Sequence, residues 1–472
     1  MRGHPNPAAL RELNLLQAAT RELPSEILSL IFEDSIFLNC REPDEDKRWE
    51  SELPVVQVLG AVCSTWRQVA WSTPALWTDI EIDFKSSDIR PQACLMKLYL
   101  ENSGELPLSL SLAYEEDMTY PVAQTTLVHP LVDKLIEEAL WRVVSLHLSY
   151  PPSLSLWLYH ASEMASLDRL WIYESRLTRD FELDLSNFSS LSVLDMWGVS
   201  GDVILPWNSI TRLFLSQIPT EVCAQLLSQC PNLERFEMDS PVFPVEEIEP
   251  PALPNVVILP HLETLTWESA GTEWDALVLR CVQTPALQSL WWMEDPFVDN
   301  LNPHLATFLQ RLPTSFRSLK IKNNSPNGFP LFFLPSNVET ETMEFGTFGF
   351  SPNVFSSILF PLKHRGDPQS SWPFPKLKQL SIHSYPAWEG PTELPVDARS
   401  TIDLVTTMAL RAAALGQIVT LQVFGLTLNW DLALFPGPLY GGENLILRVG
   451  EDQVVPLWYQ QLVPHARLSW SD

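Results

Sequence analysis

A short apolar sequence motif recurs along most of the chain and constrains its fold more than any other feature. The motif consists of an apolar residue, two variable positions, a large apolar residue, one variable position and a last apolar residue. Apolar residues two apart predict a strand, and a period of about 20–29 residues predicts stacked repeats. Ten copies have their central residues at Leu146, Leu170, Leu194, Leu213, Phe236, Leu265, Leu290, Leu319, Leu380 and Leu421, and a degenerate copy is expected near Met343 and Phe345.

Proline marks the entrance to several of these strands. Pro231, Pro260, Pro285 and Pro375 each stand five residues before a central apolar residue. Because proline cannot continue a helix and restricts the residue before it, each predicts a joint from helix to strand. Apolar stripes with helical spacing occur at 222–230, 274–281 and 305–312. The pattern therefore predicts an α/β solenoid with a parallel sheet.

The N-terminal part carries a different, helical pattern. It begins with Leu23-Pro24, where the fixed φ of proline suits the first turn of a helix. Two short helices of this size bury too little surface to fold well alone, so we expect them to dock on a partner. One apolar stripe is formed by Ile27, Leu28, Ile31 and Phe32, a second by Val55, Leu59, Val62, Trp66 and Val69, and Trp77 lies beyond them.

This pattern resembles the F-box, the module that joins a substrate receptor to the Skp adaptor of SCF-type ubiquitin ligases. The matching residues are Leu-Pro-x-Glu-Ile-Leu-x-x-Ile-Phe, Val-Cys-x-x-Trp-Arg-x-Val-Ala and Pro-x-Leu-Trp, within residues 23–77. An acidic insertion at 39–53 separates the first two helices. With this insertion the module is similar to those of the large F-box families of filamentous fungi. An ordinary helical hairpin inside a core is the alternative. The resemblance implies adaptor contacts at Leu23, Pro24, Ile27, Leu28, Ile31, Phe32, Leu59, Val62, Cys63, Trp66 and Val69.

The repeats resemble an irregular leucine-rich-repeat array, which F-box receptors often carry. The asparagine of that family, five residues after the central leucine, is present only at Asn324. The expected fold class is therefore α/β, a small all-helical F-box followed by a right-handed strand–helix solenoid, with an ordinary α/β domain as the alternative. The expected segments are a helical lead-in at 1–22, the F-box at 23–77, a joining region at 78–140 that starts the sheet, and the array at 141–472.

Composition excludes several function classes. A net charge of −28 disfavours nonspecific binding to nucleic acid or to an anionic membrane. The six cysteines form no C-x-x-C pair, which favours reduced thiols in the cytoplasm or nucleus over disulfides or zinc. No apolar leader and no apolar run of about 18 residues is present, so neither secretion nor a membrane span is expected.

No catalytic signature accompanies these repeats. The G-x-S-x-G, H-E-x-x-H and phosphate-loop patterns are absent, and no two histidines stand four apart. His147 and His383 are expected to be solvated rather than metal ligands. Cys63 is expected to be a buried small hydrophobe. We therefore expect no catalytic residue, no metal and no cofactor.

A binding face is expected on the open side of the strands. There, residues beside the buried leucines project outward, and strands stacked about 4.8 Å apart would bring them together. Aromatic residues and arginine are enriched at binding hot spots, and local arginines indicate a ligand with negative charge. The candidate substrate-binding residues are Arg169, Trp171, Tyr173, Trp197, Arg212, Phe214, Arg235 and Trp291.

The resemblance implies a non-catalytic substrate receptor of an SCF-type ligase. Its partners would be the Skp adaptor, a cullin reached through that adaptor, and a protein substrate of unknown identity. Two alternatives remain open at this point: an F-box scaffold that acts outside a ligase, and an enzyme with an unrecognised site.

Overall fold

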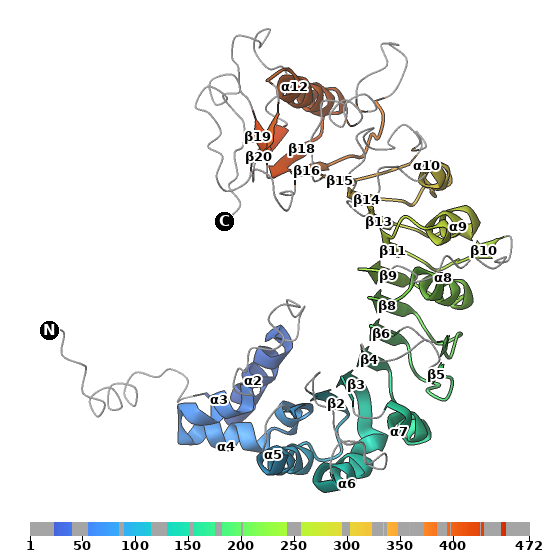
Figure 1. The fold of residues 1–472 in the computed structure, drawn as a ribbon. Helices are drawn as coiled ribbons and strands as arrows, with labels where there is room; N and C mark the ends of the chain where they lie inside the picture. Colours follow the sequence, from blue (N-terminus) through green and yellow to red (C-terminus); the bar gives the residue numbers. More distant parts are fainter. Residues whose placement is uncertain are drawn as a thin grey trace. The chain divides into compact units, whose positions relative to one another are not determined.

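The computed structural model shows an α/β protein with a large parallel sheet of fourteen strands and helices (Figure 1). The chain divides into two compact units, one of Met1–Glu174 with Asn187–Leu191 and one of Ser175–Ser186 with Ser192–Asp472. The structure describes residues 23–39, 55–84, 89–114, 130–151, 154–174, 182–199, 202–242, 256–294, 303–322, 334, 338–347, 358, 362, 372–384, 394–396, 398–424, 426–428 and 445–449. The lead-in at 1–22, residues 40–53 of the acidic insertion, and Asn324 lie outside these ranges.

The first unit begins with α2 (Ser25–Asn39), α3 (Val55–Val62), α4 (Ser64–Ser72) and the short 3-10 helix η3 (Pro74–Trp77). The prediction of one continuous helix across the second apolar stripe is wrong. Cys63 breaks it with extended backbone angles of φ −159° and ψ 173°, and its sulfur accepts the N–H of Trp66. Two helices with different axes replace one, so their apolar residues do not share a single stripe.

Four strands continue this unit: β1 (Asp79–Asp83), β2 (Leu108–Ala113), β3 (Val143–Ser149) and β4 (Arg169–Tyr173). Each pairs in parallel with the next, and β1 and β2 lie within residues 78–140. The connections between the strands include α5 (Ile89–Asn102), α6 (Pro130–Ala139), η4 (Leu140–Arg142), α7 (Leu154–Tyr159) and η5 (Ala161–Glu163).

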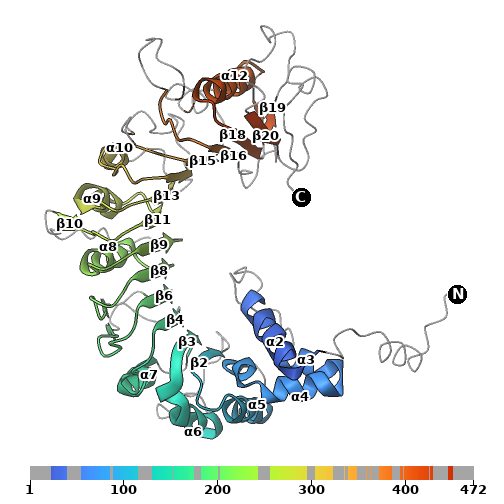
Figure 2. The same cartoon turned by 180° about the vertical axis from the view of Figure 1, so that it is seen from behind.

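The second unit contributes ten strands of the sheet, all paired in parallel. They are β6 (Val193–Trp197), β8 (Arg212–Ser216), β9 (Arg235–Asp239), β11 (Thr264–Ser269), β13 (Ser289–Glu294), β14 (Ser318–Lys322), β15 (Thr342–Thr347), β16 (Gln379–Ser384), β18 (Val419–Phe424) and β20 (Leu445–Val449). Both views show α8 (Thr220–Gln229), α9 (Glu273–Cys281) and α10 (Pro303–Leu309) on one side of the strands (Figures 1 and 2). A longer helix, α12 (Ala398–Leu415), precedes β18.

The predicted register of the repeats is confirmed. Every central residue of the ten copies, and the residue two positions later, is buried, and the degenerate copy is β15 with Met343 and Phe345 buried. The parallel pairing aligns the copies, so that Leu213, Phe236 and Leu265 are direct neighbours. Period-two burial on one face gives the sheet a continuous apolar layer against the helices.

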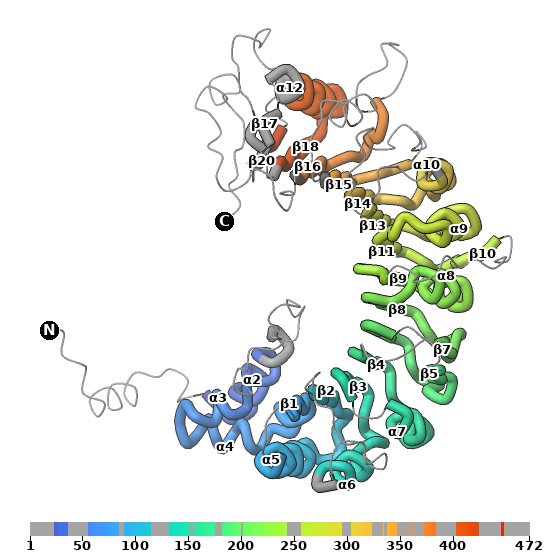
Figure 3. Tube along the Cα trace, in the orientation of Figure 1, coloured from blue at the N-terminus to red at the C-terminus, as the bar shows by residue number. Residues whose placement is uncertain are grey.

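Short strand pairs also join adjacent repeats, and each of the two repeats contributes one strand in addition to, or in place of, a helix. The pairs are β5 (Glu182–Asp184) with β7 (Asp202–Ile204) (Figure 3), β10 (Val257–Ile258) with β12 (Val282–Gln283), and β17 (Leu394–Val396) with β19 (Leu426–Leu428). Consequently Pro260 and Pro285 follow β10 and β12 rather than a helix, which corrects the predicted joints there. Pro231 does follow a helix, α8.

Four strands are each followed directly by a residue whose backbone has a positive φ, in the left-handed region. Tyr150, Gln217 and Ser240 have φ of 53°, 51° and 45°, and Gly198 has 75°. The amide of Gly198 bonds to the Ser216 carbonyl at 3.0 Å, and that of Gln217 bonds to Asp239 at 3.3 Å. Three of the four residues thus keep a ladder bond, whereas the amide of Ser240 donates to the Glu268 carboxylate at 2.8 Å. In each, the positive φ turns the chain away from the sheet, a conformation that is unusual for a residue other than glycine.

Candidate functional site

The helices at the start of the first unit leave apolar side chains uncovered. On α2, Ile27, Leu30 and Ile31 are 42%, 60% and 47% exposed, and they lie on one helix face because they are three and four positions apart. On α3, Val58 and Val62 are also exposed and are four positions apart. Exposed apolar residues that share one face of a helix are typical of an interaction surface. We call Ile27, Leu30, Ile31, Val58 and Val62 the exposed apolar set.

The other candidate adaptor residues divide between core and surface. Leu28, Phe32 and Val69 are buried, Leu23, Leu59 and Trp66 are half-buried, and Pro24 is exposed. The rings of Phe32 and Trp66 lie 4.9 Å apart, and the hydroxyls of Ser29 and Thr73 are 2.9 Å apart, so α2 packs on α4 and its end. The buried members therefore support the surface and do not form it.

The predicted burial of Cys63 is wrong, because its side chain is exposed. It caps the N-terminus of α4, where its sulfur accepts the N–H of Trp66 at 3.4 Å. Cys94 is exposed as well, whereas Cys223 and Cys230 are buried. Burial raises the pKa of Cys230 to about 12, which keeps that thiol protonated and unreactive.

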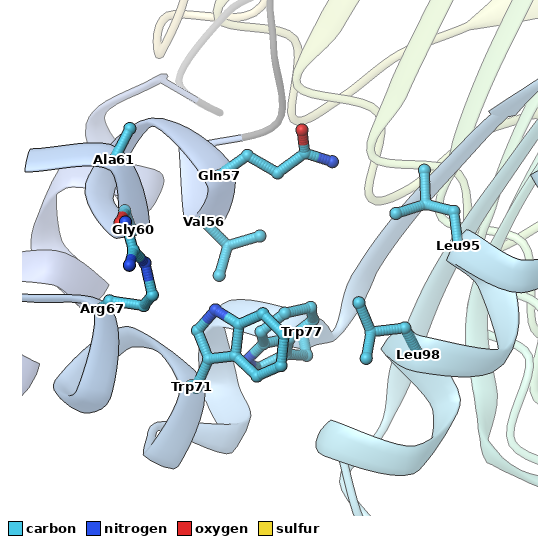
Figure 4. A pocket seen from close by; sticks show the side chains of 9 residues that line it. All are labelled: Val56, Gln57, Gly60, Ala61, Arg67, Trp71, Trp77, Leu95 and Leu98. Atoms are coloured by element: carbon cyan, nitrogen blue, oxygen red, sulfur yellow. The ribbon is translucent and has the colours of Figure 1, made fainter. Parts of the chain in front are cut away.

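A pocket of about 330 Å³ lies within the first unit, between α3, α4, η3 and α5 (Figure 4). Trp71 and Trp77 stand on one side of it, Leu95 and Leu98 of α5 on another, and Val56 between them. Its lining is mostly apolar, and Arg67 donates from Nε to the Gly60 carbonyl at 2.8 Å at its edge. The pocket thus marks the joint at which the N-terminal helices pack on the first helix of the sheet.

Replacing Gly60 with alanine is expected to stabilise this joint. A Cβ at Gly60 would meet Trp71 Nε1 at 3.7 Å and Arg67 Cγ at 3.8 Å, which are ordinary van der Waals contacts. Because glycine inside a helix is disfavoured relative to alanine, the free energy of unfolding should rise by about 0.5–1 kcal/mol. Denaturant unfolding of the full chain measures this, and a loss of stability would show that the space is not available.

On the outward strand face of the first unit, three candidate substrate residues make contacts within the protein. The rings of Trp171 and Tyr173 both lie 6.4 Å from that of His147. The two ring nitrogens of His147 are each 3.2 Å from a serine hydroxyl, of Ser111 and of Ser149. His147 is half-buried in these contacts and is therefore only partly solvated. Arg169 Nε lies 3.5 Å from the Asp168 carboxylate.

The second unit carries the other five candidates. Trp197, Phe214 and Trp291 are half-buried, and Arg212 and Arg235 are exposed. The guanidinium of Arg235 lies 5.4 Å from the centre of the Phe214 ring and 2.5 Å from the Glu237 carboxylate. Neighbouring carboxylates thus offset the charges of Arg169 and Arg235, which weakens the expectation of an acidic ligand.

The strand face of this unit is hollowed into a pocket of about 350 Å³, and Arg235 is one of the residues that line it. Trp291 and Lys320 stand side by side in it, with the ammonium 4.0 Å from the indole centre. Lys320 also lies 2.9 Å from the Glu344 carboxylate, and His383 Nε2 lies 3.6 Å from the same oxygen. Burial lowers the pKa of His383, although Glu344 opposes that shift.

Small polar residues form the floor of this pocket, and sequence reasoning missed them. The residue just before the central apolar position is hydroxyl-bearing on four adjacent strands, Thr264, Ser289, Ser318 and Thr342, and is Gln379 on the next. Each residue is unremarkable in its own repeat. The only sequence signal is the column that appears when the repeats are aligned on their central residue.

The described ranges contain no group of three or more His, Cys, Asp or Glu residues placed to hold a metal ion. Among the helices that the structure describes, none is long and apolar enough to cross a bilayer. None of the known protein-family models matches this chain. The functional argument therefore depends on the residues themselves.

Proposed function

We propose that this chain is a substrate receptor of an SCF-type ubiquitin ligase, with residues 23–77 acting as an F-box. The observation that carries the proposal is the exposed apolar set on α2 and α3, in the segment whose sequence resembles that module. Apolar surface in water is costly, and a partner that covers it would gain roughly 25 cal/mol per Å² buried. In this proposal a Skp-type adaptor covers this surface.

In this proposal the chain performs no chemistry of its own. The adaptor brings a cullin, and the cullin brings a ubiquitin-charged enzyme. The strand face of the array holds the substrate protein. Holding a substrate lysine near the charged enzyme raises its effective concentration there, which is how a non-catalytic subunit accelerates transfer.

The test is purification of the tagged full chain from cells in which the proteasome is blocked. Recovery of both a Skp adaptor and a cullin is expected. Recovery of the adaptor without cullin would favour a scaffold outside a ligase, and recovery of neither would overturn the proposal.

Replacing both Leu23 and Pro24 with alanine is expected to abolish recovery of the adaptor. The Pro24 carbonyl accepts the amides of Ile27 and Leu28 at 3.1 Å, and alanine keeps that carbonyl, so α2 should still form. Only the side chains that would face the adaptor are lost. Circular dichroism of the variant should match the wild type, and undiminished recovery of the adaptor would contradict the assignment.

A further inference from the structure

The row of hydroxyl residues across the second unit has the dimensions of a site for an extended chain. Thr264, Ser289, Ser318 and Thr342 lie on four consecutive strands and pair directly with one another in the register. Strands about 4.8 Å apart place the first and last about 14 Å from each other. An extended peptide advances about 3.3 Å per residue, so four or five residues would follow this row.

The chemistry of the row suits a peptide backbone. A hydroxyl both donates and accepts hydrogen bonds, as peptide N–H and C=O groups require from a partner. Thr342 Oγ1 donates to Ser318 Oγ at 2.9 Å, so the row is already partly connected. Trp291 also lines the pocket, and its Nε1 atom is shielded from solvent without an acceptor among the described residues. An unpaired donor of this kind gains free energy when a ligand carbonyl accepts from it.

The charges around the row are balanced. Lys320 is paired with Glu344 at 2.9 Å, and Arg235 with Glu237 at 2.5 Å, so the pocket holds two cations and two carboxylates. A phosphate binds best to arginine or lysine groups that are not already engaged. A doubly charged phosphate here would have to share a cation with the carboxylate already paired to it, on a chain whose net charge is −28. The pocket therefore favours an uncharged ligand.

From these observations we infer that the hydroxyl row of the second unit binds an extended, uncharged and unphosphorylated peptide segment of the substrate protein. This inference rests on the proposed function, since it specifies the substrate that the receptor would hold. It differs from the sequence-based expectation of an acidic ligand.

The test uses purified full chain and arrays of synthetic seven-residue peptides. One array contains only Gly, Ser, Thr, Asn and Gln, a second replaces one serine with phosphoserine, and a third carries Asp and Glu. We expect retention on the first array and at least tenfold weaker retention on the other two. Retention on no array, or stronger retention of phosphopeptides or acidic peptides, would overturn the inference.

Variants then locate the site. Thr342→Leu fills the row and should reduce retention at least tenfold, whereas Thr342→Ser keeps the hydroxyl and should bind within about threefold of the wild type. Thr420→Leu is the matched control, because Thr420 occupies the same row and is half-buried, but lies outside the pocket. Unchanged binding by a folded Thr342→Leu variant, or equal losses in the two leucine variants, would overturn the inference.

Adaptor capture is measured on the same preparations. Capture without peptide retention would overturn this inference and leave the proposed function in place. Peptide retention without adaptor capture would overturn the proposed function and leave peptide binding by the hydroxyl row in place.

Discussion

Replacing Trp77 with alanine is expected to lower the free energy of unfolding of the first unit by about 3–5 kcal/mol, the usual cost of removing a large buried aromatic side chain. Trp77 is only 2% exposed. Its ring meets Trp71 at 5.7 Å and Tyr99 at 5.1 Å, and its Nε1 donates to the Ala70 carbonyl at 3.0 Å. One side chain therefore ties α4 to α5, and its loss leaves a cavity and an unpaired carbonyl.

Denaturant unfolding followed by circular dichroism measures this cost. Trp141→Ala is the matched control, because Trp141 belongs to the same unit but is 57% exposed, and its loss should change stability by less than about 0.5 kcal/mol. Similar losses in the two variants would show that Trp77 is not the anchor of this unit.

The sequence pattern placed Trp66 in the second apolar stripe, and its incomplete burial has a local cause. A continuous helix across 55–69 would have aligned Trp66 with Val55, Leu59 and Val62. The break at Cys63 turns α4 away from that alignment, so Trp66 is only half-buried against Phe32, whereas Trp77 is enclosed. A cysteine N-cap is not among the residues that normally announce a helix start, so the break had no recognisable signal.

The strands were predicted well because their signal is strong and repeated. Leu290 and Trp292, for example, are both buried, and the same spacing recurs in the neighbouring strands. The short pairs such as β10 with β12 were missed, since two-residue strands carry no periodicity. The left-handed residues after the strands were missed as well, because Tyr150 and Gln217 are not residue types that favour positive φ.

The candidate binding face was predicted in part. Large residues such as Trp291 and Arg235 were identified, because aromatic and arginine side chains are the usual markers of an interface. The neighbouring hydroxyl row was not, because serine and threonine carry no such marker. Its significance depends on the parallel register, which places Ser289 beside Ser318 although 29 residues separate them along the chain.

Replacing both Ile27 and Ile31 with aspartate is expected to weaken adaptor binding more than about 100-fold. Both side chains are exposed in the chain alone, so aspartate there should leave the fold intact. In the proposed complex the adaptor would cover them, and two unpaired carboxylates would then be removed from water, at a cost of several kcal/mol. Unfolding of the free variant should therefore remain close to that of the wild type.

The matched control places the same charge change elsewhere. Val256 and Ile258 are exposed to a similar degree but belong to the second unit. Replacing both with aspartate should leave adaptor binding unchanged, so that any general effect of added negative charge is separated from an effect at α2.

Calorimetric titration of purified Skp adaptor into the purified full chain tests the central claim most directly. The account predicts saturable one-to-one binding by the wild type and by the Val256→Asp, Ile258→Asp control, and no measurable binding by the Ile27→Asp, Ile31→Asp variant. Absence of binding by the wild type, or equal binding by all three proteins, would contradict it.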